Sequence, residues 1–536
     1  MSATVLVRRF VEADIPAIRS LYYEVYGHDY PYKAFYDDDW LKRSIYQDSY
    51  LSLVAEVEGQ IAGTASVYFE VGAFADLCGE FGRLAVHPQY RNLGVGTELM
   101  RARIEFANRR LHFGLAECRT AHTGAQTISH QFGFMPIGFL PQKAKLSRRE
   151  SLVLTGRLFG NQPGELRRNN PRVIPEIFLL GQLALENMGL RNDLIAADDA
   201  DDYPIGTGFE VSELKEDEFP SLLRIERGRL SGRLVFGNLQ LTAGLFMLQL
   251  HESRYLVARE GNKIVGSIGF VVDDIGRTLK ALEMIALRDD VAGFLLKELD
   301  RRAQEVYHTE YFEITISAYS PTIQRTLSNL GFVPVAYCPA FVFHEVERLD
   351  TVKMAKVYVP LNIDDAQLTE ESLQVFKLVR QGFEEKQMGI VVNQATRQMA
   401  SFQGLEEGEL SKIAALCRVT NFAKGETILQ AGEEGKVMYL VMEGMINVYG
   451  ADNRHLIGEV RQGDVLGEIS MILEQPYGAT AIAATDVMLA ALKHHDFQHL
   501  IDRYPRVGMK VMRNIAASLG QKLSNQYRRF TLNGGE

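Results

Sequence analysis

The strongest chemical signal in the sequence is a glycine-rich turn at residues 91–96, Arg-Asn-Leu-Gly-Val-Gly. A strand-like stretch at 79–86 precedes it, and residues 96–110 follow with the apolar spacing of a helix. Glycines let backbone N–H groups approach an anion, and the N-terminus of a helix carries partial positive charge. Because Arg91 can add a charge-assisted contact, the pattern predicts a binding site for a pyrophosphate.

A carboxylate on the preceding strand is a candidate general base. Alternation along the strand predicts one face made of Glu80, Gly82, Leu84 and Val86. Burial beside apolar neighbours is expected to raise the pKa of Glu80 towards a value useful for a base. The alternative is a structural salt bridge at the end of the strand, with Arg83 or Arg119 as the partner.

The order of strand, Arg-x-x-Gly-x-Gly turn and helix resembles the GNAT acetyltransferase superfamily. A second matching segment is AHTGAQTISHQFGFMPIGF (121–139), which corresponds to the helix and strand that complete the coenzyme site in that family. The resemblance covers about 1–160 and implies an acyl-CoA, acetyl-CoA or another, held between two splayed parallel strands. The cofactor contacts it implies are Leu84, Ala85, Val86, Arg91, Asn92, Leu93, Gly94, Val95, Gly96, Thr97 and Phe134.

The resemblance also implies catalytic roles, with departures from the family pattern. Some members place a glutamate base where Glu80 lies. The family's acid for the leaving thiolate is commonly a tyrosine four residues before Gly133, but this chain has Ser129 there. His122 replaces a common asparagine, and it is predicted to be an acid, a base or a coenzyme contact, or else a hydrogen-bonded structural histidine.

The implied reaction is attack of an amine on a thioester, with a small molecule or a protein lysine as acceptor. The acceptor is expected near 21–40, where tyrosines and Asp37–Asp39 would suit a cationic amine. The alternative for these tyrosines is core packing. A long-chain acyl carrier could replace acetyl-CoA as donor. From a different class, Ser129 favours a non-catalytic sensor or scaffold that binds acyl-CoA and a nucleotide.

Landmarks of this region recur later in the chain. Gly133-Phe134-Met135-Pro136 returns 198 residues later as Gly331-Phe332-Val333-Pro334. In the segment 284–302, Asp290 falls at the arginine of the turn, Leu295 at its second glycine, and only Gly293 is retained. A carboxylate repels a pyrophosphate, and leucine blocks close backbone approach. The sequence therefore predicts a degenerate GNAT-like copy that keeps the fold without binding coenzyme.

The region after about 405 consists of short strand-like segments broken by glycines, followed by an amphipathic helix at 505–525. Its run GDVLGEISMI (463–472) with PYGAT (476–480) resembles the cyclic nucleotide-binding domain family. The resemblance implies a nucleotide-like effector in a pocket formed by Gly467, Glu468, Ile469, Ser470, Tyr477, Gly478, Ala479 and Thr480. In that family an arginine pairs with the cyclic phosphate, and Tyr477 takes its place, so cyclic AMP is expected to bind weakly.

The 536 residues are too many for one core. We predict an α+β multidomain protein with a catalytic GNAT domain at 1–205, a degenerate GNAT-like mixed α/β domain at 206–400, and a β-roll with flanking helices at 401–536. The acidic stretch 196–208 is expected to be a solvated linker. The C-terminal domain is expected to act as a sensor that regulates the transferase.

Composition and charge argue against several other classes of function. The net charge of −10 disfavours nucleic acid as a partner. The four cysteines lie far apart, so no metal site is expected. Since the chain meets charge early and has no apolar run of about 18 residues, neither a signal peptide nor a membrane span is expected. We expect a cytoplasmic protein, and the sequence leaves open whether it forms a homo-oligomer.

Overall fold

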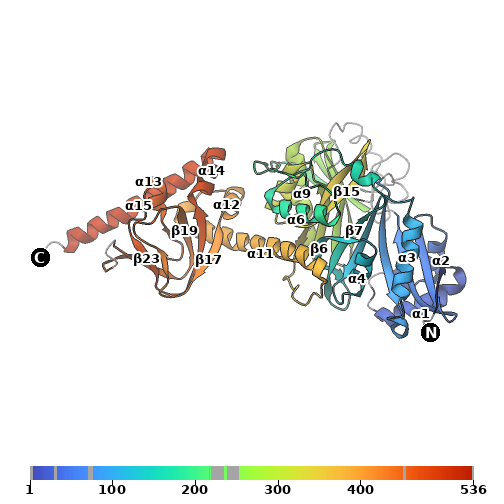
Figure 1. The fold of residues 1–536 in the computed structure, drawn as a ribbon. Coiled ribbons are helices and arrows are strands. Elements are labelled where there is room, and N and C mark those ends of the chain that lie inside the picture. Colours follow the sequence, from blue (N-terminus) through green and yellow to red (C-terminus); the bar gives the residue numbers. More distant parts are fainter. Residues whose placement is uncertain are drawn as a thin grey trace. The chain divides into compact units, whose positions relative to one another are not determined.

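The computed structural model describes residues 4–28, 30, 33–69, 76–215, 218, 222, 234–237, 253–450 and 454–533. It consists of two compact units, 1–382 and 383–536 (Figure 1). The first contains both predicted GNAT-like regions, so the boundary predicted at 205/206 falls inside a single compact unit. We describe each unit by itself.

The first half of unit 1 follows the predicted strand–helix order. Its elements are β1 (Val5–Arg9), α1 (Ile15–Tyr26), α2 (Asp38–Ile45), β2 (Tyr50–Val57), β3 (Gln60–Tyr68), β4 (Cys78–Val86), α3 (Val95–Ala107), β5 (Phe113–Arg119), α4 (Gly124–Gln131), β6 (Met135–Lys145) and β7 (Arg149–Leu158). Helices α1 and α3 lie on opposite faces of the sheet: Ala85 packs in a core with Tyr22 of α1, whereas Gly63 approaches Val95 of α3.

The second half of unit 1 repeats this order. Its elements are β10 (Glu210–Glu213), β11 (Ser253–Glu260), β12 (Lys263–Asp273), β13 (Thr278–Ala286), α9 (Asp289–Glu305), β14 (Tyr311–Ser317), α10 (Pro321–Asn329), β15 (Val333–His344) and β16 (Glu347–Val357). Between the halves lie α5 (Gln162–Glu165), β8 (Arg172–Val173), α6 (Pro175–Asn187) and β9 (Ile195–Ala196).

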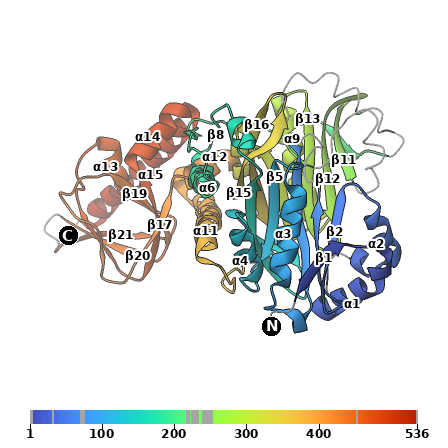
Figure 2. The same ribbon diagram turned by 45° about the vertical axis from the view of Figure 1, so that its right-hand side comes forward.

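The two halves share one sheet of 14 strands. Its order is β1-β2-β3-β4-β5-β7-β6-β15-β16-β14-β13-β12-β11-β10, so the second half repeats the first in reverse across a junction between β6 and β15 (Figure 2). At that junction Gly138 pairs with Ala336. The two sheets thereby become one continuous surface.

Helices exchanged between the halves reinforce the junction. Helix α6 follows the first half in sequence, but its Gly181 packs against Tyr337 of β15. The long α11 (Glu370–Gln398) follows the second half, and its Phe376 contacts Phe139 of β6 with ring centroids 5.0 Å apart. Each half therefore packs a helix supplied by the other.

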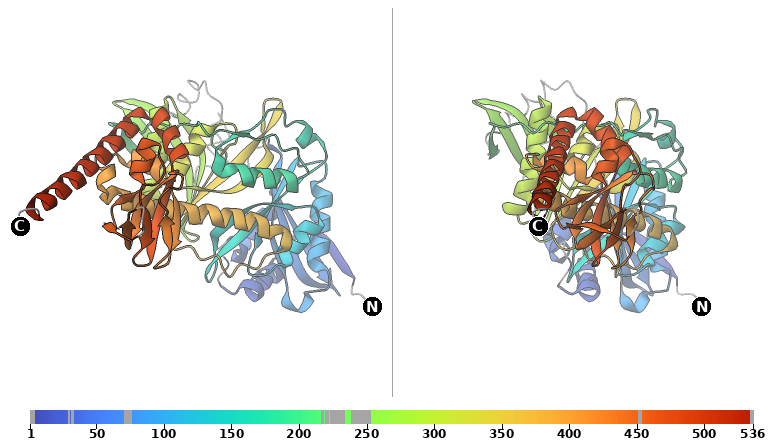
Figure 3. Two further views of the ribbon diagram at one scale, coloured as in Figure 1. Left: turned by 60° about the vertical axis from the view of Figure 1, so that its left-hand side comes forward. Right: turned by 90° about the vertical axis from the view of Figure 1, so that its left-hand side faces the viewer.

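Unit 2 has the predicted roll. Its elements are α12 (Glu407–Ala414), β17 (Arg418–Phe422), β18 (Thr427–Leu429), β19 (Val437–Glu443), β20 (Met445–Tyr449), β21 (Leu456–Arg461), β22 (Val465–Leu466), α13 (Glu468–Leu473), β23 (Thr480–Ala483), β24 (Val487–Lys493), α14 (His494–Arg503) and α15 (Pro505–Asn533). The strands form two four-stranded sheets, β17-β24-β19-β22 and β18-β23-β20-β21. The predicted terminal helix is α15, which is longer than expected (Figure 3).

The close approach of β6 and β15 leads to a prediction about the stability of unit 1. A Cβ atom at Gly138 would lie 2.2 Å from the Cβ of Ala336 and 2.4 Å from the carbonyl oxygen of Val335. Because neither atom is the end of a flexible side chain, Gly138→Val should force the strands apart and lower the free energy of unfolding of unit 1 by at least about 1–3 kcal/mol.

Urea unfolding, followed by far-ultraviolet circular dichroism, measures this change. Gly124→Ala is the matched control, because its added Cβ would meet only His122 at an ordinary 3.5 Å. Equal stability of the Gly138→Val protein and the control would show that β6 and β15 do not need this close approach.

Candidate active site

The predicted phosphate loop has the geometry of an anion site. A short 3-10 helix (Pro88–Tyr90) leads into an exposed turn at 91–94, and α3 begins at Val95. Asn92 and Gly94 adopt left-handed conformations, with φ of 67° and 80°. A Cβ atom at Gly94 would meet no atom within 4 Å. The N-terminus of α3, whose first N–H groups have no partner within the helix, is therefore approachable from the side of Gly94.

The second glycine of the loop has a packing role. A Cβ atom at Gly96 would lie 2.9 Å from Cδ1 of Ile128 on α4. Gly96 is buried, unlike the exposed turn before it. The two glycines of the motif therefore have different roles: Gly94 shapes the turn, and Gly96 allows α3 and α4 to approach each other.

Strands β4 and β5 open away from each other next to this loop. They pair in parallel only where Cys78–Glu80 face Phe113–Leu115, although β4 continues to Val86 and β5 to Arg119. Beyond that point, residues 81–86 have a backbone edge without the neighbouring strand. Unpaired backbone groups seek partners, so this edge fits the amide groups of a pantetheine chain that leads to the loop.

A β-bulge in β4 corrects the predicted side-chain alternation. Arg83 has a positive φ of 58°, and the pairing with β3 shifts register between Thr64 and Ser66. The extra residue of the bulge reverses the alternation. The prediction that one face holds Glu80, Gly82, Leu84 and Val86 is therefore wrong. Residues 80, 82 and 85 share the α1 face, and residues 84 and 86 face α3.

A buried arginine holds the bulge. The guanidinium of Arg103 on α3 donates to the carbonyl oxygens of Ser66 and Gly82, at 3.3 and 3.2 Å. It also lies over the ring of Phe81, 5.6 Å from the centroid. Burial lowers its pKa to about 10, which still leaves the side chain charged at neutral pH.

Glu80 forms an ion pair with Arg83, one of the two alternatives weighed above. Its Oε1 accepts a hydrogen bond from Nη1 of Arg83 at 2.6 Å, and about a quarter of the glutamate side chain is exposed. Burial favours the neutral carboxyl, but the charge and hydrogen bond of Arg83 outweigh it, so the pKa of Glu80 is lowered. The expected rise is therefore wrong: the bulge that reverses the alternation also brings Arg83 to the carboxylate.

His122 has different neighbours from Glu80. Burial lowers the pKa of its imidazole, and the charges of Arg119 and Arg91 lower it further. His122 lies next to the N-terminus of α4, where its Nδ1 would be 3.5 Å from a Cβ at Gly124. A neutral imidazole near Arg91 fits a coenzyme contact better than a partner of Glu80 in proton transfer.

Two residues of the α4 region lie in the core. Ser129, at the family's tyrosine position, is buried with its Oγ 3.3 Å from Sγ of Cys118. Phe134 is fully buried, with its ring centroid 4.9 Å from that of Phe81. The prediction that the Phe134 side chain binds cofactor is therefore wrong, because a closed aromatic core surrounds the ring.

Most of the described tyrosines in 21–40 pack in a hydrophobic core, which agrees with the core-packing alternative. Tyr22 is 1% exposed and its ring lies 4.6 Å from that of Phe35. Tyr26 is half-buried, and the guanidinium of Arg119 lies 5.8 Å from its ring centroid. The sequence indicated Arg83 as a possible partner of Glu80 and the tyrosines of 21–40 as a group, but it did not predict that Tyr26 would lie beside Arg119.

In the second half, the chain itself covers the corresponding helix N-terminus. Gly206 donates its N–H to the carbonyl oxygen of Asp290 at 3.0 Å, and a Cβ atom at Gly293 would lie 2.4 Å from the carbonyl oxygen of Pro204. Tyr203 is buried here. The expectation that 196–208 is a solvated linker is therefore wrong at Tyr203, which is buried, and at Gly206, which contacts the start of α9, whereas Pro204 and Ile205 are exposed.

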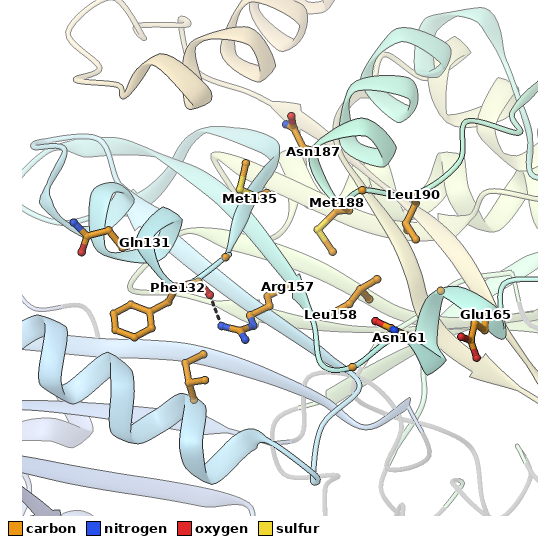
Figure 4. A pocket seen from close by; sticks show the side chains of 15 residues that line it. Gln131, Phe132, Met135, Arg157, Leu158, Asn161, Glu165, Asn187, Met188 and Leu190 are labelled. Atoms are coloured by element: carbon orange, nitrogen blue, oxygen red, sulfur yellow. Dashed lines mark hydrogen bonds between the residues drawn. The ribbon is translucent and has the colours of Figure 1, made fainter.

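A pocket of about 870 Å³ lies at the far ends of α3 and α4, away from the phosphate loop (Figure 4). Arg157 of β7 donates to the carbonyl oxygen of Phe132 at its edge, and Asn187 and Met188 line it from the end of α6. Its lining includes none of the predicted site residues.

The nucleotide-like pocket of unit 2 has a tyrosine built into its wall. The hydroxyl of Tyr477 donates to the carbonyl oxygen of Val437 at 2.8 Å and accepts from the Val437 N–H at 3.1 Å. Gly467 is left-handed at the start of α13, with its Cβ position 3.4 Å from the Tyr477 ring. Glu468 and Ser470 are buried, whereas Ile469 is exposed. Tyr477 thus ties α13 to β19 at the place where the family's arginine would lie.

The predicted pocket residues on β23 also take part in structure. Thr480 is buried and its Oγ1 accepts the N–H of Ala431 at 3.2 Å. A Cβ atom at Gly478 would meet nothing within 4 Å. Gly478 therefore lies beside open space, between the buried Tyr477 and the half-buried Ala479.

Two family models match this chain, one within each compact unit. The model of the acetyltransferase (GNAT) family matches residues 15–134, and the model of the cyclic nucleotide-binding domain matches residues 419–504. The chain therefore contains a GNAT acetyltransferase domain and a C-terminal cyclic nucleotide-binding domain. Residues 206–400 lie outside both matched ranges.

The similar curated proteins match over part of their length. A cAMP-dependent protein kinase regulatory subunit of Colletotrichum orbiculare is 31% identical over 105 residues, which is 20% of this chain and 27% of that protein. A cyclic AMP receptor protein of Thermus thermophilus is 30% identical over 128 residues, 23% of this chain and 56% of that protein. A solved cyclic nucleotide-binding domain from Methylobacillus flagellatus KT is 21% identical, with a TM-score of 0.25, over 27% of this chain and 84% of that one. The chain thus spans about a quarter of the first relative and just over half of the second.

Among the residues that the structure describes, no helix is both long and apolar enough to cross a membrane. Nor do the described side chains include a group of three or more His, Cys, Asp or Glu placed to hold a metal ion.

Proposed function

We propose that the chain is an acyl-CoA-dependent N-acyltransferase, with acetyl-CoA as the donor to test first and an amine as acceptor. The observation that carries the proposal is the opening between β4 and β5, which leads to the N-terminus of α3 at Gly94. That opening offers an unpaired strand edge at 81–86 for pantetheine and a helix end for the pyrophosphate. Arg91, Asn92, Leu93, Val95 and Thr97 would contact the coenzyme around this loop.

The coenzyme would supply an activated acyl group as a thioester. Transfer requires that the acceptor nitrogen lose a proton, form a bond to the acyl carbon and displace the thiolate, which then takes a proton. Glu80 is the proposed base, since it lies on the α1 face of β4 at the point where the strands separate. The hydroxyl of Tyr26, beside Arg119, is the proposed replacement for the tyrosine absent at 129.

The second half is proposed to be a degenerate GNAT copy. Its strand order repeats that of the first half, and β13 and β14 also pair over only three residues before they separate. Here α9 begins at Asp289 after only two intervening residues, so Asp290 and Leu295 lie within the helix and not in a loop. Leu295 approaches Gly266 as Leu99 of α3 approaches Gly63, so the predicted match of Leu295 to the second loop glycine is wrong. Pro204 and Gly206 contact the first turns of α9. We therefore propose one coenzyme site per chain.

The first functional prediction concerns that site. Replacing Gly94 and Gly96 by leucine should abolish binding of acetyl-CoA, because leucine at 94 is strained at positive φ and leucine at 96 pushes α3 away from α4. Calorimetric titration should give one site per chain for the natural sequence and none for the double variant.

Gly261→Leu is the matched control. Gly261 has a φ of 58° with open space around its Cβ position, like Gly94, but it belongs to the turn between β11 and β12. Unchanged affinity of the Gly94/Gly96 double variant, or two equivalent sites in the natural chain, would contradict the proposed location.

The second functional prediction uses the ion pair between Glu80 and Arg83. If Glu80 is the base, Glu80→Gln should lower kcat by about 10²–10⁴-fold with little change in coenzyme affinity. Arg83→Met removes the charge that lowers the pKa of Glu80, so this pKa should rise. The base must be deprotonated, and activity of Arg83→Met should therefore fall off at a higher pH than that of the natural chain.

The measurement is the pH profile of kcat, with Glu98→Gln on the exposed face of α3 as the control. A loss below threefold for Glu80→Gln, at a pH where the amine is mostly protonated, would make Glu80 a structural carboxylate.

A non-catalytic acyl-CoA and nucleotide sensor is the second candidate, and the buried Ser129 at the usual acid position is the observation that favours it. Thiol release from acetyl-CoA in the presence of a panel of amines separates the two functions. Coenzyme binding without thiol release for any amine would support the sensor.

We further propose that the cyclic nucleotide-binding domain regulates the transferase but holds cyclic AMP weakly. The regulation needs a ligand with different affinities for two states of the chain. Support for weak binding comes from Tyr477, which uses its hydroxyl on Val437 and offers no positive charge to a phosphate.

The third functional prediction tests this pocket. Tyr477→Arg should strengthen cyclic AMP binding by about tenfold or more, because a guanidinium gives the phosphate a charge-assisted partner. Tyr477→Phe removes the same hydroxyl without adding charge and serves as the control. Calorimetry measures the affinity, and acyl transfer by the full chain with and without cyclic nucleotides measures regulation. Sub-micromolar binding by the natural chain would overturn the claim of weak binding.

A further inference from the structure

Charged residues from both halves gather on the face of the sheet that carries Glu80. Nζ of Lys143 on β6 lies 2.6 Å from Oε1 of Glu117 on β5 and 3.1 Å from Oε2 of Glu313 on β14. Lys353 on β16 reaches the other oxygen of Glu313 at 3.1 Å. This central charge cluster, completed by Lys280 of β13, joins the two halves across the β6–β15 junction.

Lys280 differs from the other lysines of the cluster in its position on the strand and in its lack of an ion pair with any described residue. Glu80 and Lys280 are the last paired residues of β4 and β13 before each strand separates from its parallel neighbour. Lys280 is the register partner of Glu313 in that pairing, yet among the described residues its ammonium group makes no ion pair or hydrogen bond. Burial lowers the pKa of its ammonium, and the charges of Lys353 and Lys143 lower it further, against the opposing pull of Glu313.

The cluster is short of negative charge. It contains three lysines, Lys143, Lys280 and Lys353, against two glutamates, Glu117 and Glu313. Both glutamates already form ion pairs with Lys143, and Glu313 also forms one with Lys353. Lys280 is half-buried and its ammonium has no carboxylate of its own among the described residues, so one further anion would stabilise the cluster. The buried hydroxyl of Tyr311 and Oε2 of Glu313 both lack a hydrogen-bond partner in the described part of the chain, so the cluster holds one unused donor and one unused acceptor.

The cluster is close enough to Glu80 to affect its charge, and part of it is exposed. Side chains of Lys143 and Glu117 are 20% and 26% exposed, and Lys280 itself is only half-buried. The charges of Lys143 and Lys280 contribute to the lowered pKa of Glu80. A molecule that presents an amine to Glu80 could therefore place a second group at Lys280.

We propose that Lys280 and the central charge cluster bind a carboxylate of the acceptor, so that the acceptor is an amino acid or a similar compound with both an amine and a carboxylate. This inference rests on the proposed acyltransferase function. It assigns the second half a substrate-binding role in place of the coenzyme site that its covered helix end has lost.

The charge balance favours a carboxylate over a phosphate. The excess is a single positive charge, whereas a phosphate monoester carries about −1.5 to −2 at pH 7. A second negative charge would face Glu117 and Glu313 without compensation. A carboxylate also has two oxygens, which can accept from the Lys280 ammonium and from one neighbouring donor.

The experiment compares acceptors that differ only at the carboxylate. Acyl transfer from acetyl-CoA by the full chain is measured with a panel of L-amino acids, their carboxamides and the corresponding amines without a carboxyl group. The natural chain should prefer the amino acids. Lys280→Met should lower kcat/KM for them by about 10- to 100-fold, mainly through KM, and leave the carboxamides unchanged.

Two variants control for folding and for charge. Lys280→Arg should keep most of the preference, because it keeps the charge at the same site. Lys263→Met, at the exposed start of β12, removes a lysine away from the cluster and should behave as the natural chain. Equal use of amino acids and carboxamides by the natural chain would overturn the inference, whether or not Lys280→Met folds.

A binding measurement separates this inference from the proposed function. The same amino acids and carboxamides are titrated calorimetrically into the full chain saturated with CoA. If no acceptor supports transfer, the proposed function fails; binding of amino acids that Lys280→Met weakens would still support the carboxylate site. Binding that is absent, or that Lys280→Met leaves unchanged, would overturn it and make Lys280 a structural charge.

Discussion

The close approach of β6 and β15 at Gly138 is the constraint on which unit 1 depends. A side chain there would overlap Ala336, so glycine is what allows the two half-sheets to become one. Continuity of the sheet lets Lys143 of the first half reach Glu313 of the second. It also sets Glu80 and Lys280, equivalent positions in two similar halves, on one common face. Without the junction, neither half would have the other's charges within reach.

The same arrangement gives the second half a structural role that does not depend on coenzyme binding. The start of α9 is contacted by Pro204 and Gly206. The second half also supplies strand β15 at the junction, a helix that packs on the first half, and Glu313 and Lys353 of the charge cluster. These contacts support the first half whether or not the second half binds a coenzyme.

The sequence predicted local strands, turns and helices, but it did not predict which distant residues the fold brings together. The strand, turn and helix around 91–96, the repeat and the β-roll were all visible, because periodicity and glycine positions carry that information. The bulge at Arg83 was not, since a single left-handed residue leaves no periodic signal, and the face assigned to Glu80 was therefore wrong. The central charge cluster had no signal at all, because its residues come from five strands spread over 117–353.

The bulge shows why packing and chemistry are linked at this site. Arg103 reaches from α3 to the carbonyl oxygens of Ser66 and Gly82, the paired residues of β3 and β4 directly before the extra residue, and so holds β4 where it departs from regular pairing. That departure turns Arg83 towards Glu80 and sets the charge state of the carboxylate. An ionised glutamate held by an arginine is a weaker base than a buried neutral one would become on ionisation. Under the proposed function, the ion pair with Arg83 would therefore orient Glu80 towards the acceptor rather than increase its strength as a base.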